Sequence, residues 1–232
     1  MNDILERLRG SLIVSCQASK DSPLHGPAMM NAMARAAEIG GAEGIRAEGI
    51  TDIKEIRKSV DLPMIGIIKD KSYDSEVYIT PTLEEINKIL SLGVEIVAFD
   101  ATERDRPTDA STKEICSCIA ENHALSMADI SSLKEAKHAA DSGAHIISTT
   151  LSGYTEGGRK KEGPDLELVK KISDTLERPV FAEGRIRFPE QAKKALELGA
   201  HAVVVGSAIT RPHEITESFV DTMRDSHKVH KE

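Results

Sequence analysis

The stretch Pro179-Val-Phe-Ala-Glu-Gly-Arg-Ile-Arg187 decides the fold of this chain. A short apolar run ends there abruptly in an acid, a glycine and two arginines. A second apolar run, Ala202-Val-Val-Val-Val-Gly-Ser-Ala-Ile-Thr210, ends in Gly206-Ser207 beside Arg211. Both runs are typical of buried strands in a parallel sheet. Because glycine lets backbone N–H groups come close to an anion, the two strand ends together predict a phosphate pocket.

The composition describes an acidic protein with few aromatic residues. Hydrophobic residues make up 40% of the 232 residues and charged residues 29%, as in ordinary globular proteins. This length fits one large domain spanning residues 1–232. Nucleic-acid-binding surfaces use basic patches and stacking rings, whereas this chain has a formal net charge of −8 and 3% aromatics. We therefore expect no nucleic-acid partner, and a small anionic ligand held by a local cluster of arginines.

The cysteines and the N-terminus indicate where the protein works. Cys16, Cys116 and Cys118 fit neither a disulfide framework nor a zinc signature, which is the usage expected in a reducing cytosol. The first ten residues mix charges with apolar side chains, unlike a signal peptide. No apolar run approaches the length of about 18 residues that a membrane span needs. We expect a cytoplasmic protein with no membrane partner.

Apolar runs alternate with amphipathic segments along the whole chain. A short helix is expected near residues 4–8. Besides the two runs quoted above, strands are expected at 12–17, 42–46, 64–68, 94–99, 124–129 and 146–148. Helices are expected at 27–39, 51–60, 83–92, 109–121, 165–176 and 212–224. Two more helices are expected to begin after a cap at 131–132 and at residue 189.

A weak internal repeat supports this alternation. Helix–Gly–apolar junctions occur at Gly41-Ala42, Gly93-Val94, Gly143-Ala144 and Gly199-Ala200, at intervals of 52, 50 and 56 residues. Each interval has the length of two βα units. Eight strands alternating with eight helices predict an α/β fold with a parallel sheet, which closes most naturally into a (β/α)8 TIM barrel. A doubly wound open sheet remains the alternative, although no Gly-x-Gly-x-x-Gly follows the first strand.

In a barrel, functional side chains collect at the C-terminal ends of the strands. Those ends read Gln17, Arg46, Lys69, Asp100, Asp129, Ser148-Thr149, Glu183-Gly184-Arg185 and Gly206-Ser207. Lys69 and Glu183 stand out, because each directly follows an apolar strand. No histidine lies at a strand end beside a carboxylate, so a metal-dependent mechanism lacks its ligands. His25 lies in the loop after the first strand, where an ordinary loop histidine is the simpler interpretation. The polar segment 153–163 is a candidate lid.

Seven segments of the chain resemble the N-acylmannosamine-6-phosphate 2-epimerase family of ribulose-phosphate-binding barrels. They are Val14-Ser-Cys-Gln17 with Pro23-Leu-His-Gly26, Gly44-Ile-Arg-Ala47, Ile65-Gly-Ile-Ile-Lys69, Ala128-Asp-Ile-Ser131, Thr149-Thr-Leu-Ser-Gly-Tyr154, Ala182-Glu-Gly-Arg-Ile186 and Val205-Gly-Ser-Ala-Ile-Thr-Arg-Pro212. The resemblance covers essentially the whole chain and keeps the order of the motifs. It implies interconversion of N-acetylmannosamine 6-phosphate and N-acetylglucosamine 6-phosphate in the catabolism of sialic acid and other amino sugars.

The resemblance also implies roles for individual residues. Lys69 looks like the proton-transfer residue at C2, and Glu183 looks like its hydrogen-bonded catalytic partner. Contacts to the sugar and its N-acyl group are implied for Gln17, Arg46, Asp129 and Thr149. The phosphate site is implied for Gly184, Arg185, Gly206, Ser207 and Arg211. After the lysine this chain departs from the family pattern, with Lys69-Asp70-Lys71-Ser72-Tyr73, so Asp70 and Tyr73 receive no role.

The implied chemistry fits these residue types. Epimerisation at C2 removes a proton next to a masked aldehyde, so the ring opens first and the enolate needs nearby positive charge or hydrogen-bond donors. Lys69 serves as a base only if its pKa falls, which burial and Arg46 favour. Neither a metal nor an organic cofactor is needed. Two alternatives stay open: a Schiff-base aldolase or lyase acting on a phosphorylated sugar, and a non-catalytic phosphosugar-binding protein. We expect a homodimer, with the helix at 212–224 packing against a neighbour.

Overall fold

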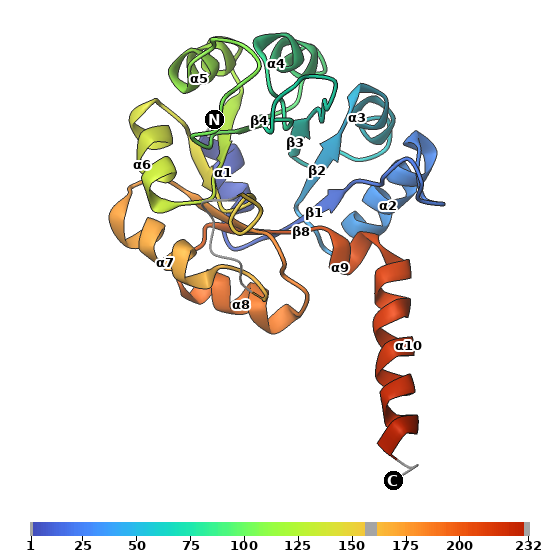
Figure 1. Ribbon diagram of the computed structural model, residues 1–232. Helices are drawn as coiled ribbons and strands as arrows, with labels where there is room; N and C mark the ends of the chain where they lie inside the picture. Colours follow the sequence, from blue (N-terminus) through green and yellow to red (C-terminus); the bar gives the residue numbers. More distant parts are fainter. Residues whose placement is uncertain (1, 156–161, 230–232) are drawn as a thin grey trace.

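The eight strands form a closed parallel barrel in the order in which they occur in the chain. The structure is a computed structural model that describes residues 2–155 and 162–229. Neighbouring strands pair in parallel all the way round, and β8 closes the barrel on β1 through Leu12 opposite Val203. Helices surround the strands (Figure 1). The (β/α)8 barrel prediction is confirmed, and the open-sheet alternative is wrong.

The element bounds follow the predicted alternation. The strands are β1 (Leu12–Cys16), β2 (Gly44–Glu48), β3 (Met64–Ile67), β4 (Ile96–Asp100), β5 (Leu125–Asp129), β6 (Ile146–Ser148), β7 (Val180–Glu183) and β8 (Ala202–Val205). The helices are α1 (Asn2–Leu8), α2 (Pro27–Ile39), α3 (Ile50–Ile56), α4 (Leu83–Leu90), α5 (Thr112–Glu121), α6 (Leu133–Asp141), α7 (Leu166–Thr175), α8 (Pro189–Glu197), α9 (Ser207–Thr210) and α10 (Pro212–Val229).

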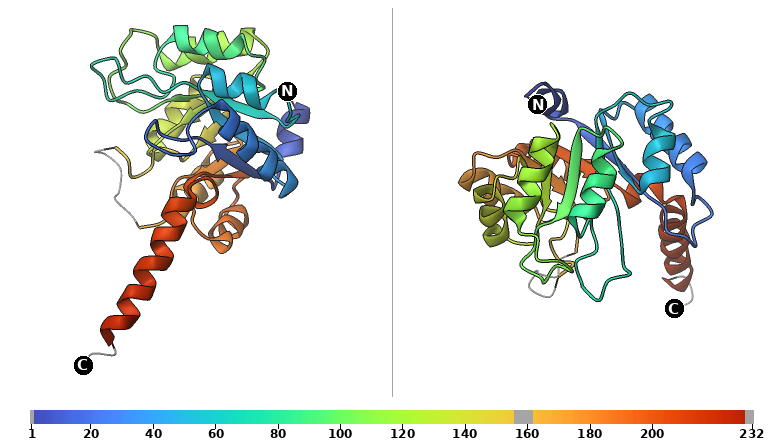
Figure 2. Two further views of the ribbon diagram at one scale, coloured as in Figure 1. Left: turned by 90° about the vertical axis from the view of Figure 1, so that its right-hand side faces the viewer. Right: turned by 90° about the horizontal axis from the view of Figure 1, so that it is seen from above.

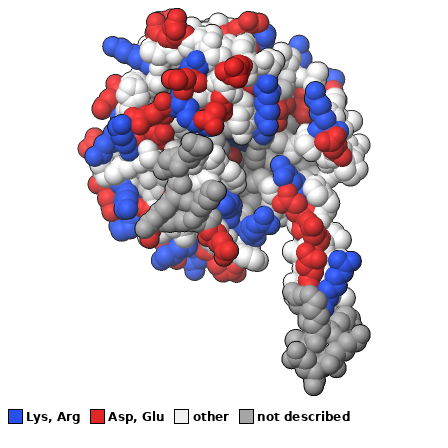
Figure 3. All heavy atoms as spheres, viewed as in Figure 1, with Lys and Arg blue, Asp and Glu red and all other residues white. Residues whose placement is uncertain are grey.

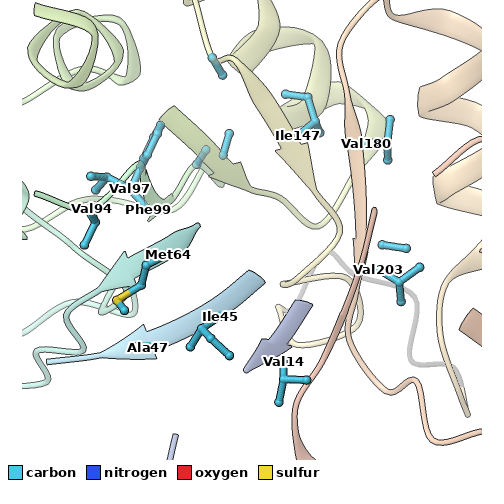
Figure 4. Close-up of a cluster of buried hydrophobic side chains, with 14 of the residues drawn as sticks. Val14, Ile45, Ala47, Met64, Val94, Val97, Phe99, Ile147, Val180 and Val203 are labelled. Atoms are coloured by element: carbon cyan, nitrogen blue, oxygen red, sulfur yellow. The ribbon is translucent and has the colours of Figure 1, made fainter. Parts of the chain in front are cut away.

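Two hydrophobic cores result from the alternation of side chains along each strand. One fills the barrel interior and includes Ile67, Phe181 and Val204, all buried. The other lies between the strands and the surrounding helices, and Figure 4 shows part of it, with Ile45 and Val97 among the labelled side chains. With no Trp in the chain, both cores are built almost wholly from aliphatic residues. The barrel is therefore a packed core rather than a channel.

The N-terminal helix α1 closes the end of the barrel opposite the strand C-termini. Leu8 of α1 is fully buried among the interior residues, and Leu5 packs partly buried beside it. His201 Nε2 lies 2.6 Å from the carbonyl oxygen of Leu5, and the His201 ring stacks on Phe181. The predicted short N-terminal helix is confirmed, and His201 acts there as a packing residue.

Most helix starts lie where the sequence signals them. Thr82 caps α4 in a capping box with Glu85, Ser132 caps α6, and Pro189 is the first residue of α8. The start of α5 was predicted three residues too early. Ser111 is the true cap, because its side chain accepts a hydrogen bond from the backbone N–H of Glu114.

The second strand was predicted two residues too early, at 42–46. Pairing with β1 begins only at Gly44, and pairing with β3 continues to Glu48 opposite Ile67. The strand therefore ends at Glu48, and Arg46 and Glu48 lie on the same face because side chains alternate. The four glycines of the internal repeat all adopt positive φ at the ends of α2, α4, α6 and α8, which explains their regular recurrence.

The last helix leaves the barrel. Figure 2 shows α10 projecting away from the ring of helices, after the single turn of α9 that the sequence did not predict. Of the helices in the described ranges, none is both long and apolar enough to cross a membrane. Residues 156–161 of the candidate lid at 153–163 lie outside the described residues.

Candidate active site

A cavity of about 310 Å³ opens at the C-terminal ends of the barrel strands. This volume is near the lower end of the range for small-molecule sites, roughly 300–1,000 Å³. Most of the residues predicted for the site line this one cavity: Gln17, Arg46, Lys69, Glu183, Gly184, Arg185, Gly206, Ser207 and Arg211. They come from β1, β2, β3, β7, β8 and the loops that follow these strands, so only the closed barrel brings them together.

Arg46 occupies the centre of a buried charge cluster. Its guanidinium donates to both carboxylate oxygens of Asp129, with Nη1–Oδ1 at 3.2 Å and Nη2–Oδ2 at 2.6 Å. Nη1 also donates to Glu183 Oε2 at 2.7 Å. Arg46 is 1% exposed and Asp129 is fully buried. Burial alone would lower the pKa of Arg46, but the two carboxylates more than offset it and raise the pKa, so the guanidinium stays charged.

One arginine faces two carboxyl groups, which leaves one negative charge unbalanced unless a carboxyl group holds a proton. Asp129 receives two hydrogen bonds from Arg46, whereas Glu183 receives one. Burial raises the pKa of Glu183 to about 7, against the lowering effect of Arg46, and the charge of Asp129 adds to the rise. Glu183 is therefore the member of the cluster that carries the proton near neutral pH.

The position of Thr150 agrees with a protonated Glu183. Thr150 Oγ1 lies 2.7 Å from Asp129 Oδ1 and 3.0 Å from Glu183 Oε2. A threonine hydroxyl has one proton to donate, so it satisfies only one of these carboxyl oxygens as a donor. When the hydroxyl donates to Asp129, its two lone pairs can accept from Ser148 Oγ, 2.8 Å away, and from a protonated Glu183.

Lys69 enters the cavity from the end of β3. Its backbone is held by an antiparallel bridge to Ile79. Nζ donates to Gln17 Oε1 at 2.5 Å and lies 3.4 Å from Glu48 Oε2. Burial lowers the pKa of Lys69, Glu48 raises it, and the charge of Arg46 lowers it further; the net shift is downward. An amine with a lowered pKa is the form of lysine that can accept a proton.

Backbone at the ends of β7 and β8 forms the other part of the cavity wall. Gly184 has φ of +107° and lines the cavity without a side chain. Gly206 precedes α9, whose first residue, Ser207, also lines the cavity. Arg211 reaches the same wall and pairs with Glu214 at 2.7 Å. On the face shown in Figure 3, charges of both signs are interspersed. These arginines would therefore attract an anion at short range, and not through a broad positive surface.

Arg185 links two loops of the site. It adopts φ of +55°, which is unusual for a residue other than glycine. Its guanidinium donates to the carbonyl oxygens of Ser152 at 2.5 Å and Gly163 at 2.7 Å. The same group lies 5.1 Å from the ring centre of Tyr154. Arg185 therefore ties the loop after β7 to the ends of the segment that follows β6.

Three buried polar residues at strand ends, Asp129, Thr149 and Asp100, are not among the residues that line the cavity. Asp129 orients Arg46, as described above. Thr149 Oγ1 donates to the backbone carbonyl of Glu183 at 2.9 Å and accepts from its N–H at 3.1 Å, so it fixes the end of β7. Asp100 is fully buried and pairs with Arg104 at 2.6 Å. His25 is exposed, with Nδ1 3.3 Å from the carbonyl oxygen of Ala18, as expected for a loop histidine.

Sequence reasoning missed four residues that contribute to the site. Thr150, Tyr78 and Arg187 line the cavity. Glu48 contacts Lys69. Its signal was its spacing, since a residue two positions after Arg46 on a strand shares its face. Tyr78 gave no such signal, because it reaches the cavity through the loop that returns to Lys69.

Comparisons relate the chain to sugar-phosphate epimerases. Residues 30–225 match the model of the family described as "Putative N-acetylmannosamine-6-phosphate epimerase". A relative named as such a 2-epimerase in Clostridioides difficile (strain 630) is 52% identical over 217 residues, covering 94% of this chain and 97% of the relative. Another, from Caldanaerobacter subterraneus subsp. tengcongensis, is 51% identical over 225 residues, covering 96% and 95%.

A solved structure agrees with these relatives. The N-acetylmannosamine-6-phosphate 2-epimerase from Clostridium perfringens superposes with a TM-score of 0.92 at 47% identity, covering 94% of this chain and 96% of that one. The similarity therefore extends through the whole barrel.

Proposed function

The chain belongs to the N-acetylmannosamine-6-phosphate epimerase family, and on that premise we propose that it interconverts N-acetylmannosamine 6-phosphate and N-acetylglucosamine 6-phosphate. It is an isomerase of the carbohydrate 2-epimerase class, with a place in the catabolism of sialic acid and related amino sugars. One observation carries the assignment of its residues. A lysine and a glutamic acid with oppositely shifted pKa values share one cavity with a wall of backbone amides and arginines.

In the proposed reaction Lys69 moves the proton at C2. The sugar ring opens to expose the C1 aldehyde, and the neutral amine of Lys69 accepts the C2 proton. The electron pair of the C–H bond moves onto the C1 oxygen and gives an enolate, which the charge of Arg46 in the same cavity stabilises. A second proton donor, an acidic group or a hydroxyl of the substrate, then protonates the opposite face of C2. The Lys69 ammonium returns its proton to that donor through solvent, so the cycle leaves no net change in atoms or electrons.

Glu183 serves the ring-opening and ring-closing steps in this proposal. Its pKa of about 7 suits a group that both gives and takes a proton near neutral pH. It exchanges that proton with a sugar oxygen while Thr150 and Arg46 hold its carboxyl group in place. Asp129 keeps Arg46 charged and oriented, and Gln17 contacts the N-acylated end of the sugar.

The phosphate group lies at the wall formed by the ends of β7 and β8. Backbone N–H groups at Gly184, Gly206 and Ser207 donate to its oxygens, and Arg211 supplies charge. Arg185 takes part mainly by holding the neighbouring loop, because its guanidinium already donates to two carbonyl oxygens. In this proposal the phosphate lies at one end of the cavity and the reacting carbon at the other.

Proton exchange at C2 tests the reaction directly. The purified protein is mixed with N-acetylmannosamine 6-phosphate in D₂O, and the C2 proton is followed by NMR. We expect deuterium to enter C2 as the second epimer forms. Lys69→Ala abolishes this exchange while the sugar phosphate still binds, and the matched variant Lys58→Ala, an exposed lysine of the loop after α3, exchanges normally.

Other outcomes of the same experiment would contradict the proposal. Exchange that persists in Lys69→Ala removes Lys69 from the mechanism. No exchange in the unaltered protein argues against an epimerase. A covalent adduct trapped by borohydride with the substrate would favour the Schiff-base aldolase instead, and binding without any chemical change would favour a phosphosugar-binding protein.

We further propose that the chain is one domain, residues 1–232, that forms a homodimer through α10. This helix projects from the barrel and exposes Phe219 (66%), Ile215 (38%) and Val220 (37%) (Figure 1). Since α9 is a single turn, the barrel wall outside β8 lacks a full helix. An apolar groove of about 450 Å³ lies there, lined by residues such as Leu12, Leu196 and Ile209. Helix α10 of a second copy would fill this groove.

A cytoplasmic location completes the proposal. The three cysteines are free thiols, two of them buried, which suits a reducing compartment.

A further inference from the structure

Glu48 is the one carboxylate beside Lys69 to which the mechanism gives no role. It is the last residue of β2 and shares the inner face of that strand with Arg46. Its side chain is 30% exposed, and Oε2 lies 3.4 Å from Lys69 Nζ. Lys69 is 31% exposed, so the pair lies at the cavity edge rather than in its buried centre.

The contacts of the two glutamates separate their roles. Glu183 Oε2 is bound by Arg46 at 2.7 Å and lies 3.0 Å from Thr150. In the described residues, the contacts within bonding distance of Lys69 Nζ are Gln17 Oε1 and Glu48 Oε2. The family resemblance implied that Glu183 is hydrogen-bonded to Lys69. The geometry instead gives Lys69 its ion pair with Glu48.

We propose that Glu48 is a positioning residue that, together with the Gln17 amide, holds the Lys69 amine at the edge of the cavity and governs its protonation. The inference rests on the proposed function, because it assigns Glu48 a role in the same C2 proton transfer. Glu48 does not touch the reacting atoms. It acts through Lys69.

The charges around this pair determine the direction of the effect. Arg46 from β2 and Glu183 from β7 act on Lys69 besides Glu48, and Tyr78 lines the same cavity. Glu48 and His25 both act electrostatically on Asp52 of α3, in opposite directions. An anion at 3.4 Å favours the ammonium form of Lys69, whereas burial and Arg46 favour the neutral amine.

Glu48 therefore raises the pKa of Lys69 and narrows the pH range in which its amine is neutral. In the free enzyme, Glu48 holds the charged ammonium group of Lys69 and so fixes the position of Nζ. Lys69 can act as a base only after this group has lost a proton. Removal of the Glu48 charge would make the neutral amine more abundant at lower pH, but it would also leave Nζ with Gln17 as its remaining described partner. The expected kinetic signature is a displaced pH profile together with a lower maximal rate.

The test measures Lys69 itself. Protein labelled with ¹³C at the lysine Cε positions is titrated by NMR, and the Lys69 signal is identified as the one missing in Lys69→Ala. In Glu48→Gln we expect the midpoint of the Lys69 titration to fall by about one pH unit, a tenfold change in the ratio of neutral to charged amine. The acid limb of kcat/KM for C2 exchange moves in the same direction.

Two further variants sharpen the result. Glu48→Asp keeps the charge and restores the Lys69 midpoint towards its original value. Glu55→Gln removes a carboxylate of α3 that pairs with Lys58 and leaves Lys69 unchanged. A Lys69 midpoint that is the same in Glu48→Gln and the unaltered protein overturns the proposal. The titration is a property of the free protein, so its outcome is separate from failure of the epimerase assignment, which shows as absent C2 exchange.

Discussion

At the scale of single residues, Arg46 determines the electrostatics of the cavity. It is almost fully buried, and its Nη atoms satisfy Asp129 and Glu183 together. Its Nε is buried and has no hydrogen-bond partner among the described residues. The loss of this arginine would leave two buried carboxyl groups side by side without a counter-charge.

We expect Arg46→Met to destabilise the protein severely. Removal of one partner from a buried charge cluster costs on the order of 3–5 kcal/mol of unfolding free energy. Urea denaturation followed by circular dichroism measures the loss. The control is Arg9→Met, whose arginine is exposed and paired with Glu6, and which should unfold at the same urea concentration as the unaltered protein. A loss below about 1 kcal/mol would contradict the proposed importance of this cluster.

The raised pKa of Glu183 predicts a specific pH dependence of stability. Between about pH 4.5, where an unfolded glutamate loses its proton, and about pH 7, the folded state holds a proton that the unfolded state has released. The folded state therefore binds more protons, and stability falls as pH rises through this window. Above pH 7 the Glu183 contribution is constant.

Glu183→Gln should remove this decline. Because glutamine mimics the protonated glutamate, the unfolding free energy of the unaltered protein is expected to fall relative to that of the variant by on the order of 2–3 kcal/mol from pH 5 to pH 8. Urea titrations at several pH values measure it, and other titrating groups cancel in the difference. Glu190→Gln on the surface of α8 serves as the control and should show no such trend. A pH-independent difference for Glu183→Gln would refute the raised pKa.

At the scale of elements, β3 and α4 approach each other unusually closely at Gly66. A Cβ built on Gly66 would lie 2.6 Å from Ile89 Cγ2 and 3.3 Å from Val94 Cγ1. Ile89 is fully buried and β-branched, so it has little freedom to move aside. The contact matters for the proposed function because Lys69 lies two residues after the end of β3, and a displaced strand would displace its amine.

We expect Gly66→Ala to cost about 1–3 kcal/mol of stability, the usual range for overpacking a core. In an Ile89→Ala background the methyl group at position 66 meets no Cγ2 and should cost much less. A double-mutant cycle by urea denaturation measures this coupling. Additive effects of the two substitutions would show that the close approach does not limit the position of β3.

At the scale of the whole molecule, α10 and the groove beside α9 complement each other. The helix exposes apolar side chains, and the groove exposes an apolar surface where a barrel would ordinarily carry its last helix. Each copy offers both surfaces, so two copies can satisfy both at once by two-fold symmetry. Arg211 and Glu214 lie at the base of α10, so the proposed interface would begin beside the cavity that Arg211 lines.

Phe219→Glu is expected to convert the proposed dimer into a monomer. A charge at a largely exposed phenylalanine removes apolar contact area and cannot enter the groove without losing hydration. Light scattering after size-exclusion chromatography measures the molecular mass. Glu217→Lys, on a different side of the same helix, should remain dimeric. An unaltered protein that is already monomeric at micromolar concentration would refute the proposed dimer.

Local sequence signals predicted much of the fold. Thr82, Ser132 and Pro189 start their helices because capping and proline chemistry act within one turn. Errors arose where pairing with another strand decides the bounds, as at Glu48, or where a single short turn such as α9 lacks periodicity. The cavity residues at strand ends, such as Arg46 and Glu183, were located by the same reasoning, since a strand end is a local feature. Tyr78 was missed because it reaches the cavity through a loop.

The amino-acid sequence by itself predicted the alternation of strands and helices and most of the polar side chains at the C-terminal ends of the strands, because the period of each apolar run and its polar end are encoded locally. Only the tertiary structure decided which charges meet. Arg46 and Glu183 are 137 residues apart in sequence, yet they share a hydrogen bond. The pairing of Lys69 with Glu48 and the proton held by Glu183 depend on distances across the barrel and on the loss of water around each group, and neither quantity exists until the barrel has closed.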